Sequence, residues 1–221
     1  MRARLYVHDA ARLGFAALAL VAIAYQFSYL DNSPTFRFSA GNFFSFFTIQ
    51  TNLFAIAMLA LAVVVRRNER GLPFDAVRGA VTLYIAITGV VFALLLSGLQ
   101  EQLDTHIGWV DFTVHKLMPI VVVADWLLEP ARHRLPVWTA AVWLTYPLAW
   151  FSYTLARGPS ASWYPYPFVD VASHGYGRVL LNAAIFTLCF AGAAFALVLV
   201  GNWRADVGVP TASRESASAQ A

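Results

Sequence analysis

The sequence has little charge. Only 12% of its 221 residues are Asp, Glu, Lys or Arg, about half of the roughly 25% in an average soluble domain. Hydrophobic residues make up 59% of the chain. This balance excludes an ordinary soluble domain and predicts an integral membrane protein whose length allows one compact bundle.

Cysteine and metal-binding patterns are also scarce. The single cysteine, Cys189, lies in an apolar run and cannot form a disulfide within the chain. The five histidines are scattered, and no cysteine joins them at a metal-ligand spacing. The sequence therefore calls for no metal and no organic cofactor.

The formal net charge is +3, but most basic residues are arginines in short loops. This distribution is typical of membrane-topology signals rather than of a nucleic-acid-binding surface. We expect a membrane protein without a nucleic-acid partner.

Six apolar stretches have about the 20-residue length that crosses a bilayer. They are roughly Leu13–Leu30, Phe43–Val65, Val77–Leu99, Val110–Leu128, Pro136–Tyr153 and Gly177–Gly201. The predicted fold is an all-α bundle of six transmembrane helices within residues 1–205, placed in the cell membrane. Residues 206–221 are predicted to be a disordered polar tail.

The basic residues predict the direction of these spans. Eleven arginines fall in the N-terminal segment, the second-to-third loop, the fourth-to-fifth loop and the tail, and three fall on the opposite side. Because positive residues stay in the cytoplasm, both termini are expected there.

Polar side chains recur at one depth in the outer half of the predicted bundle. Thr48 and His115 each lie roughly 7–8 Å below the outer ends of their spans, at about 1.5 Å per residue. Gln26, Tyr146 and Asn182 lie at similar depths in three further spans. Because polar groups in hydrocarbon are costly and usually face the bundle interior, we interpret this layer as a candidate site.

The second span carries the densest polar cluster. Thr48, Thr51 and Asn52 follow i, i+3, i+4 spacing and share one helix face, whereas Gln50 points away from Thr48. A lone threonine in a membrane helix usually bonds the backbone or a neighbouring helix. The functional interpretation therefore depends on the other polar groups at this depth.

The fourth span places Asp111 four residues before His115, so its carboxylate can reach the imidazole. Asp125 lies about 15 Å deeper and cannot orient the same ring. We expect Asp125 to pair near the cytoplasmic end, where Asn or Tyr partners are available.

The loop between the fifth and sixth predicted spans combines aromatic residues with prolines, in the run Ser162–Asp170. Its tryptophan and tyrosines favour the membrane interface, and its prolines disfavour a helix. The loop either anchors the chain at the interface or covers the polar layer as a lid, with Tyr166 controlling the access of water.

Three segments together resemble a known family. They are Phe46–Leu53 (FFTIQTNL), His115–Pro119 (HKLMP) with Asp125 after it, and Trp163–Phe168 (WYPYPF). Their order and spacing resemble the androgen-induced-protein family, which includes the androgen-dependent TFPI-regulating proteins and bacterial membrane proteins. The resemblance extends from the first span to the sixth.

This resemblance implies a multi-pass α-helical protein that hydrolyses fatty acid esters of hydroxy fatty acids with a threonine nucleophile and an essential histidine. The threonine corresponds best to Thr48 and the histidine to His115. Thr51 stays open as the alternative nucleophile.

The chemistry expected of such a site follows from its residue types. A threonine hydroxyl needs a neighbouring base, and a neutral imidazole can accept its proton. Thr48 would attack a lipid ester carbonyl, His115 would act as the base and Asp111 would fix the imidazole tautomer. The candidates to stabilise the oxyanion are Gln50, Thr51 and Asn52.

Two other functions remain open at this point. The first is a non-catalytic lipid-binding protein on the same scaffold, and the second is a small transporter that uses Asp125, His115 and the polar layer. In the favoured interpretation the partner is a lipid or fatty acid ester from the bilayer. The sequence leaves the oligomeric state open.

Overall fold

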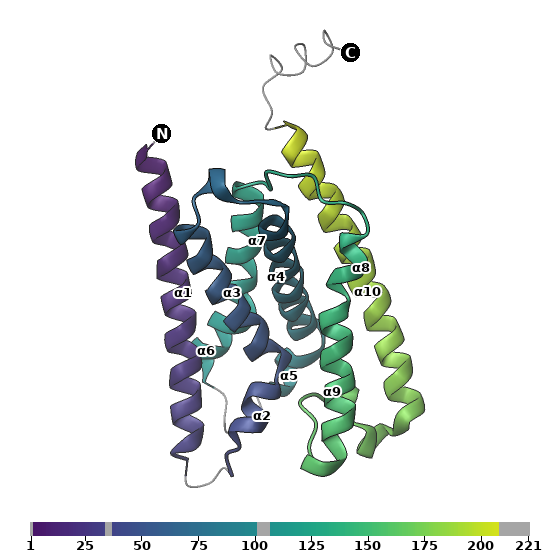
Figure 1. The fold of residues 1–221 in the computed structure, drawn as a ribbon. Helices are drawn as coiled ribbons and strands as arrows, with labels where there is room; N and C mark the ends of the chain where they lie inside the picture. Colours follow the sequence, from purple (N-terminus) through teal and green to yellow (C-terminus); the bar gives the residue numbers. More distant parts are fainter. Residues whose placement is uncertain (1, 34–36, 101–106, 208–221) are drawn as a thin grey trace.

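The computed structural model describes residues 2–33, 37–100 and 107–207, which form a helical bundle without a strand (Figure 1). The all-α prediction is thus confirmed. Within this described part, four helices are long and apolar enough to cross a membrane. They are Tyr6–Asp31, Phe47–Val64, Leu72–Leu96 and Val171–Ala205. The predicted tail lies almost entirely outside the described residues.

The first half of the chain forms three long helical segments. Their elements are α1 (Arg2–Asp31), α2 (Ala40–Ser45), α3 (Phe47–Val64), the 3-10 turn η1 (Arg67–Glu69), α4 (Leu72–Val91), the π-helical turn η2 (Phe92–Leu96) and α5 (Ser97–Gln100). The first three predicted spans all fall within these segments.

The second half begins with a helix that contains a π-helical turn and ends with the longest helix. Its elements are α6 (Gly108–Phe112), the π-helical turn η3 (Thr113–Leu117), α7 (Met118–Leu128), α8 (Thr139–Trp143), α9 (Thr145–Ala161), the 3-10 turn η4 (Pro167–Val169) and α10 (Val171–Val207). Gly175 interrupts α10 with a φ of 72°, a backbone angle that favours glycine.

The fourth predicted span is helical and the fifth is helical from Thr139 onward, but neither is among the four long apolar helices. Residues 108–128 are helical throughout but carry three charged residues, Asp111, Lys116 and Asp125. Residues 139–161 are divided at Leu144 into helices of 5 and 17 residues.

The long helices stand side by side, with α1 at one edge of the bundle and α9 and α10 at the other (Figure 1). Helix α3 packs between α1 and α4, and α4 also contacts α7 and α10. The beginning of α1, the α3–α4 loop, the α7–α8 loop and the end of α10 lie at one end. We call this the first end, and the end with α2, α5 and the α9–α10 loop the second end.

Helix α4 approaches its neighbours closely at Gly79. A Cβ placed there would lie 2.5 Å from Trp143 Cζ2 and 3.3 Å from Trp126 Cη2. Both indoles are buried, and Trp143 Nε1 donates to Ala76 O at 3.0 Å, which fixes its ring. Contact between α4 and these two rings therefore requires glycine at this position.

The second predicted span is broken near its outer end, where a continuous helix was expected. Phe46 separates α2 from α3 with an extended backbone (φ −65°, ψ 127°). A helix break inside an apolar environment needs partners for the freed backbone groups. Trp150 Nε1 donates to Ser45 O at 2.9 Å, and Thr48 N donates to Tyr166 Oη at 3.2 Å. Two distant aromatic residues thus stabilise the break.

Candidate functional site

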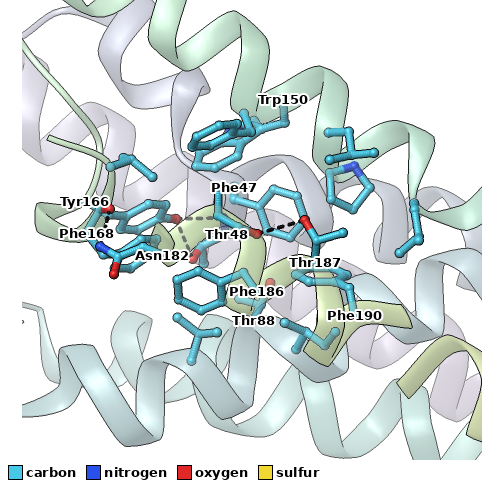
Figure 2. Close-up of a pocket in the computed structure, with 18 of the residues that line it drawn as sticks. Phe47, Thr48, Thr88, Trp150, Tyr166, Phe168, Asn182, Phe186, Thr187 and Phe190 are labelled. Atoms are coloured by element: carbon cyan, nitrogen blue, oxygen red, sulfur yellow. Dashed lines mark hydrogen bonds between the residues drawn. The ribbon is translucent and has the colours of Figure 1, made fainter. Parts of the chain in front are cut away.

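A cavity of about 820 Å³, including its open mouth, lies among α3, α4, α9, α10 and the α9–α10 loop (Figure 2). Most of its wall is apolar and aromatic, with Phe47, Trp150, Phe186 and Phe190 among the lining residues. The polar side chains on the wall are Thr48, Thr88, Tyr166, Asn182 and Thr187. An apolar wall with a few polar groups is typical of a site for a small, largely apolar ligand.

Thr48 lies in the first turn of α3, directly after the break at Phe46. Its hydroxyl Oγ1 is 3.2 Å from Tyr166 Oη, and its backbone N–H donates to the same oxygen, also at 3.2 Å. The Thr48 hydroxyl thus lies on the cavity wall beside a phenol rather than being bonded to the backbone of its own helix.

The aromatic and proline-rich loop closes one end of the cavity. Tyr166, Phe168 and Val169 line the wall, and Asn182 Nδ2 donates to Phe168 O at 3.0 Å. Trp163 packs edge-on against Phe46, with ring centroids 5.3 Å apart. The loop therefore covers the candidate site.

The other polar groups after Thr48 bond within the protein. Thr51 is fully buried, does not line the cavity, and pairs with Thr88 Oγ1 at 3.1 Å and with Thr48 O at 3.2 Å. Asn52 Nδ2 uses both of its hydrogens, donating to Thr48 O at 2.9 Å and to Val114 O at 3.0 Å. Of the two threonines, Thr48 is the one in contact with the cavity.

His115 forms the predicted contact with Asp111. His115 Nδ1 lies 2.8 Å from Asp111 Oδ1, and both side chains are buried. The imidazole stacks on Phe92, with ring centroids 4.1 Å apart. If Nδ1 carries the proton and donates to Asp111, Nε2 is free of a proton and can act as a base.

Thr48 and His115 lie on adjacent helices, and Asn52 joins the two segments. The Asn52 amide group bridges Thr48 O and Val114 O, the carbonyl of the residue before His115. The hydrogen bonds of the described residues connect Thr48 to Tyr166 and His115 to Asp111, and none connects Thr48 directly to His115. Asn52 thus links the backbones of the two segments, while the Thr48 and His115 side chains share no hydrogen bond.

The remaining members of the predicted layer lie outside the cavity wall. Tyr146 Oη donates to Gln50 Oε1, and Gln50 Nε2 donates to Phe44 O at 2.7 Å. Gln26 is half-buried on α1. The oxyanion donors expected of Gln50, Thr51 and Asn52 thus have protein acceptors in this conformation.

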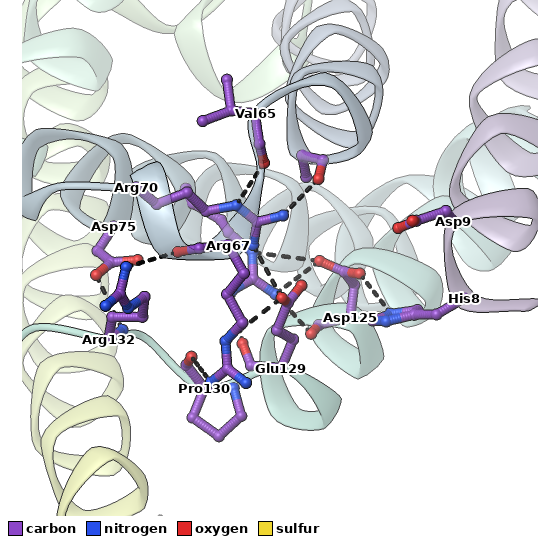
Figure 3. A network of polar contacts seen from close by, with 12 residues as sticks. His8, Asp9, Val65, Arg67, Arg70, Asp75, Asp125, Glu129, Pro130 and Arg132 are labelled. Carbon is purple, nitrogen blue, oxygen red and sulfur yellow. Dashed lines mark hydrogen bonds and ion pairs between the residues drawn. The ribbon is translucent and has the colours of Figure 1, made fainter. Parts of the chain in front are cut away.

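Asp125 lies near the end of α7, outside the cavity wall, and its partners differ from those expected (Figure 3). Arg12 Nε donates to its Oδ1 at 2.7 Å, Arg78 Nη2 donates to its Oδ2 at 2.7 Å, and His8 Nε2 lies 2.9 Å from Oδ1. The expected Asn or Tyr partners are therefore replaced by two arginines and a histidine. Buried arginine needs a carboxylate partner, which explains this choice.

Glu129 extends the same cluster of charges. It pairs with Arg12, and Arg70 Nη1 lies 3.0 Å from its Oε1. Burial raises the pKa of the Glu129 carboxyl. The hydrogen bond and the positive charge of Arg12, and then those of Arg70, lower this pKa by more. The pKa of Glu129 therefore lies below its ordinary value of 4.5. We call Arg12, Arg70, Arg78, Asp125 and Glu129 the ionic cluster.

Sequence reasoning missed two features of the structure. The helix break at Phe46 has no proline or glycine to mark it. Arg12 and Arg78 were counted as topology signals, although both are buried in the ionic cluster. Arg12 directly precedes the first predicted span and Arg78 is the second residue of the third, so their positions in the sequence did not distinguish them from loop arginines.

Among the described residues, no group of three or more His, Cys, Asp or Glu side chains is placed to hold a metal ion. No family model, curated protein or solved structure matches the chain.

Proposed function

We propose that this protein is a membrane-embedded hydrolase of lipid esters in which Thr48 is the nucleophile and His115 is the base. The observation that carries the proposal is the position of Thr48, whose hydroxyl lies on the wall of an otherwise apolar cavity. The resemblance of the three sequence segments to a family of threonine hydrolases supports the same assignment.

The cavity suits an acyl chain. Its lining extends along α10 from Asn182 to Phe190, about 12 Å along the helix axis. Tyr166 lies in the α9–α10 loop and Asn182 donates to that loop, whereas Phe190 lies about two turns farther along α10. An ester group would lie beside Thr48 with its acyl chain against the aromatic wall.

The pair formed by His115 and Asp111 supports a catalytic role. Its 2.8 Å contact has the geometry that fixes a histidine tautomer in serine hydrolases. Catalysis requires the Thr48 side chain to leave Tyr166 and approach the imidazole. Catalytic hydrogen bonds often form only when substrate is bound, so the separation seen here is compatible with the proposal.

We further propose that the bundle crosses the cell membrane six times with both termini in the cytoplasm. Residues 108–128 and 139–161 would be the two additional spans, and their charged or polar residues face protein neighbours at several points. The beginning of α1 and the end of α10 lie at the same end of the bundle, together with the arginine-rich loops (Figure 1). Arginine-rich loops are typical of the cytoplasmic side.

A non-catalytic lipid-binding protein is the second candidate. It is favoured by one observation, the hydrogen bonding of Thr48 to Tyr166 rather than to His115. The structure supports the transporter interpretation less, because the Asp125 carboxylate already forms ion pairs with Arg12 and Arg78.

Hydrolysis by the purified protein in detergent tests the proposal, with a 4-nitrophenyl ester of a long-chain fatty acid as the probe. We expect Thr48→Ala to abolish turnover, Thr48→Ser to retain part of it and Thr51→Ala to retain most of it. Binding of a fluorescent fatty acid is measured in parallel. Binding without turnover by the folded wild type would replace the hydrolase with the lipid-binding protein.

A further inference from the structure

The phenol of Tyr166 occupies a distinctive position at the beginning of α3. The break at Phe46 leaves the first N–H groups of α3 without acceptors in their own helix. Tyr166 Oη accepts from the Thr48 N–H at 3.2 Å and lies 3.2 Å from Thr48 Oγ1. One oxygen atom thus contacts both the hydroxyl of the proposed nucleophile and the backbone N–H of the same residue.

The Tyr166 ring is held rigidly in this place. It stacks on Phe168 with centroids 5.2 Å apart, and it packs against Phe46 at 5.6 Å and Trp150 at 5.9 Å. Asn182 fixes the loop by donating to Phe168 O. A group held on several sides can present a hydrogen bond donor without further ordering.

The phenol also keeps its proton. Tyr166 is 9% exposed, and this burial raises the pKa of its hydroxyl above the ordinary value of 10.0. At neutral pH the side chain is therefore a hydrogen bond donor and cannot replace His115 as a base.

We propose that Tyr166 is a catalytic residue whose hydroxyl donates to the carbonyl oxygen of the ester that Thr48 attacks. This role rests on the proposed hydrolase function. When the Thr48 side chain turns toward His115, the substrate oxygen would take the place beside Tyr166 Oη that Thr48 Oγ1 fills here. It would then accept a hydrogen bond from the phenol, while the Thr48 N–H keeps its bond to Tyr166 Oη.

The reaction balances with the groups named and water. The Thr48 proton moves to His115, Thr48 Oγ1 bonds to the ester carbon, and the carbonyl electron pair moves to oxygen, where the Tyr166 hydroxyl stabilises it. The carbon–alkoxy bond then breaks, and His115 returns the proton to the leaving alcohol. Water hydrolyses the acyl-Thr48 by the same route and releases the fatty acid.

A purely structural role for Tyr166 predicts different kinetics. A residue that only fixes the loop would alter the cavity and raise KM, whereas a donor to the developing oxyanion contributes mainly to kcat. Loss of one oxyanion donor typically lowers kcat about 10²–10³-fold. The separation of kcat from KM therefore distinguishes the two roles.

The test compares Tyr166→Phe with Tyr84→Phe on the 4-nitrophenyl ester. Tyr84 is a matched control, since its buried hydroxyl donates to Trp143 O at 2.8 Å, outside the cavity wall. We expect Tyr166→Phe to lower kcat about 10²–10³-fold with little change in KM, and Tyr84→Phe to leave kcat near that of the wild type.

An active wild type with an equally active Tyr166→Phe, or with a change confined to KM, would overturn the role of Tyr166 alone. A wild type without turnover would overturn the hydrolase proposal and this role with it. If Tyr166→Phe does not fold, a fluorinated tyrosine at position 166 keeps the hydroxyl and makes it more acidic. The alkaline limb of the kcat–pH profile should then move to lower pH, and an unmoved limb would contradict the proposal.

Discussion

At the scale of single residues, the two ends of the bundle use polar groups differently. At the first end, the ionic cluster matches buried arginines with Asp125 and Glu129, and Arg70 also donates to Val65 O at 3.1 Å at the end of α3. At the second end, the polar side chains on the mostly apolar cavity wall are neutral hydroxyl and amide groups. The buried arginine–carboxylate pairs therefore lie at one end, and the candidate chemistry lies at the other.

The ionic cluster predicts an acid-sensitive contribution to stability. Because the pKa of Glu129 is lowered in the folded state, its ion pairs stabilise the fold above pH 4.5 and are lost as the pH falls from 4.5 through the folded pKa. We expect Glu129→Gln to lower the free energy of unfolding by about 1.5–3 kcal/mol at neutral pH, the range of hydrogen bonds to charged groups. The deficit should shrink below pH 4.5.

Thermal unfolding in detergent at several pH values measures this effect. Glu69→Gln is the control, because Glu69 is exposed in the neighbouring loop and its removal should change the free energy little. A Glu129→Gln variant as stable as the wild type at neutral pH would contradict the assignment.

Sequence reasoning at this scale succeeded where partners are close along the chain. The contact between Asp111 and His115 follows from their spacing of four residues. The contact between Thr48 and Tyr166 joins residues 118 positions apart and depends on the path of the α9–α10 loop. The sequence alone carries no signal of that path, so Tyr166 was expected only as part of a lid or an anchor.

At the scale of elements, apolar runs located the helices, but not their internal breaks. The first predicted span, Leu13–Leu30, lies inside α1, whereas the second is divided at Phe46. The division is stabilised by Trp150 and Tyr166, which come from α9 and from the loop after it. Helix breaks of this kind depend on tertiary partners and have no signal in the neighbouring sequence.

Helix packing around Gly79 predicts that alanine at this position destabilises the protein, although alanine usually stabilises a helix relative to glycine. Alanine normally favours a helix over glycine by about 0.5–1 kcal/mol. At Gly79 the added methyl would meet Trp143 at 2.5 Å, so we expect Gly79→Ala to lower the free energy of unfolding by about 1–3 kcal/mol.

The matched control is Gly14→Ala in α1, where no atom lies within 4 Å of the added Cβ. It should be neutral or stabilising by up to about 1 kcal/mol. The melting temperatures of Gly79→Ala and Gly14→Ala in detergent measure this difference. Equal effects would show that α4 does not pack against these indoles as described.

At the scale of the whole molecule, the arrangement of the ends predicts a topology. Asn68 is exposed in η1 at the first end, and Ser160 is exposed on α9 at the second end. In a Cys189→Ser background, a membrane-impermeant maleimide should label Ser160→Cys in intact cells. It should label Asn68→Cys only after the membrane is opened. Labelling of both positions in intact cells would contradict the proposed orientation.

The most direct test of the central claim is covalent labelling of the folded, detergent-solubilised protein with a fluorophosphonate, with the adduct located by mass spectrometry. We expect a single adduct on Thr48 that is lost in Thr48→Ala and His115→Ala and retained in Thr51→Ala. A folded wild type that is not labelled, or that is labelled at another residue, would contradict Thr48 as the nucleophile. The cavity would then be interpreted as a binding site for lipid.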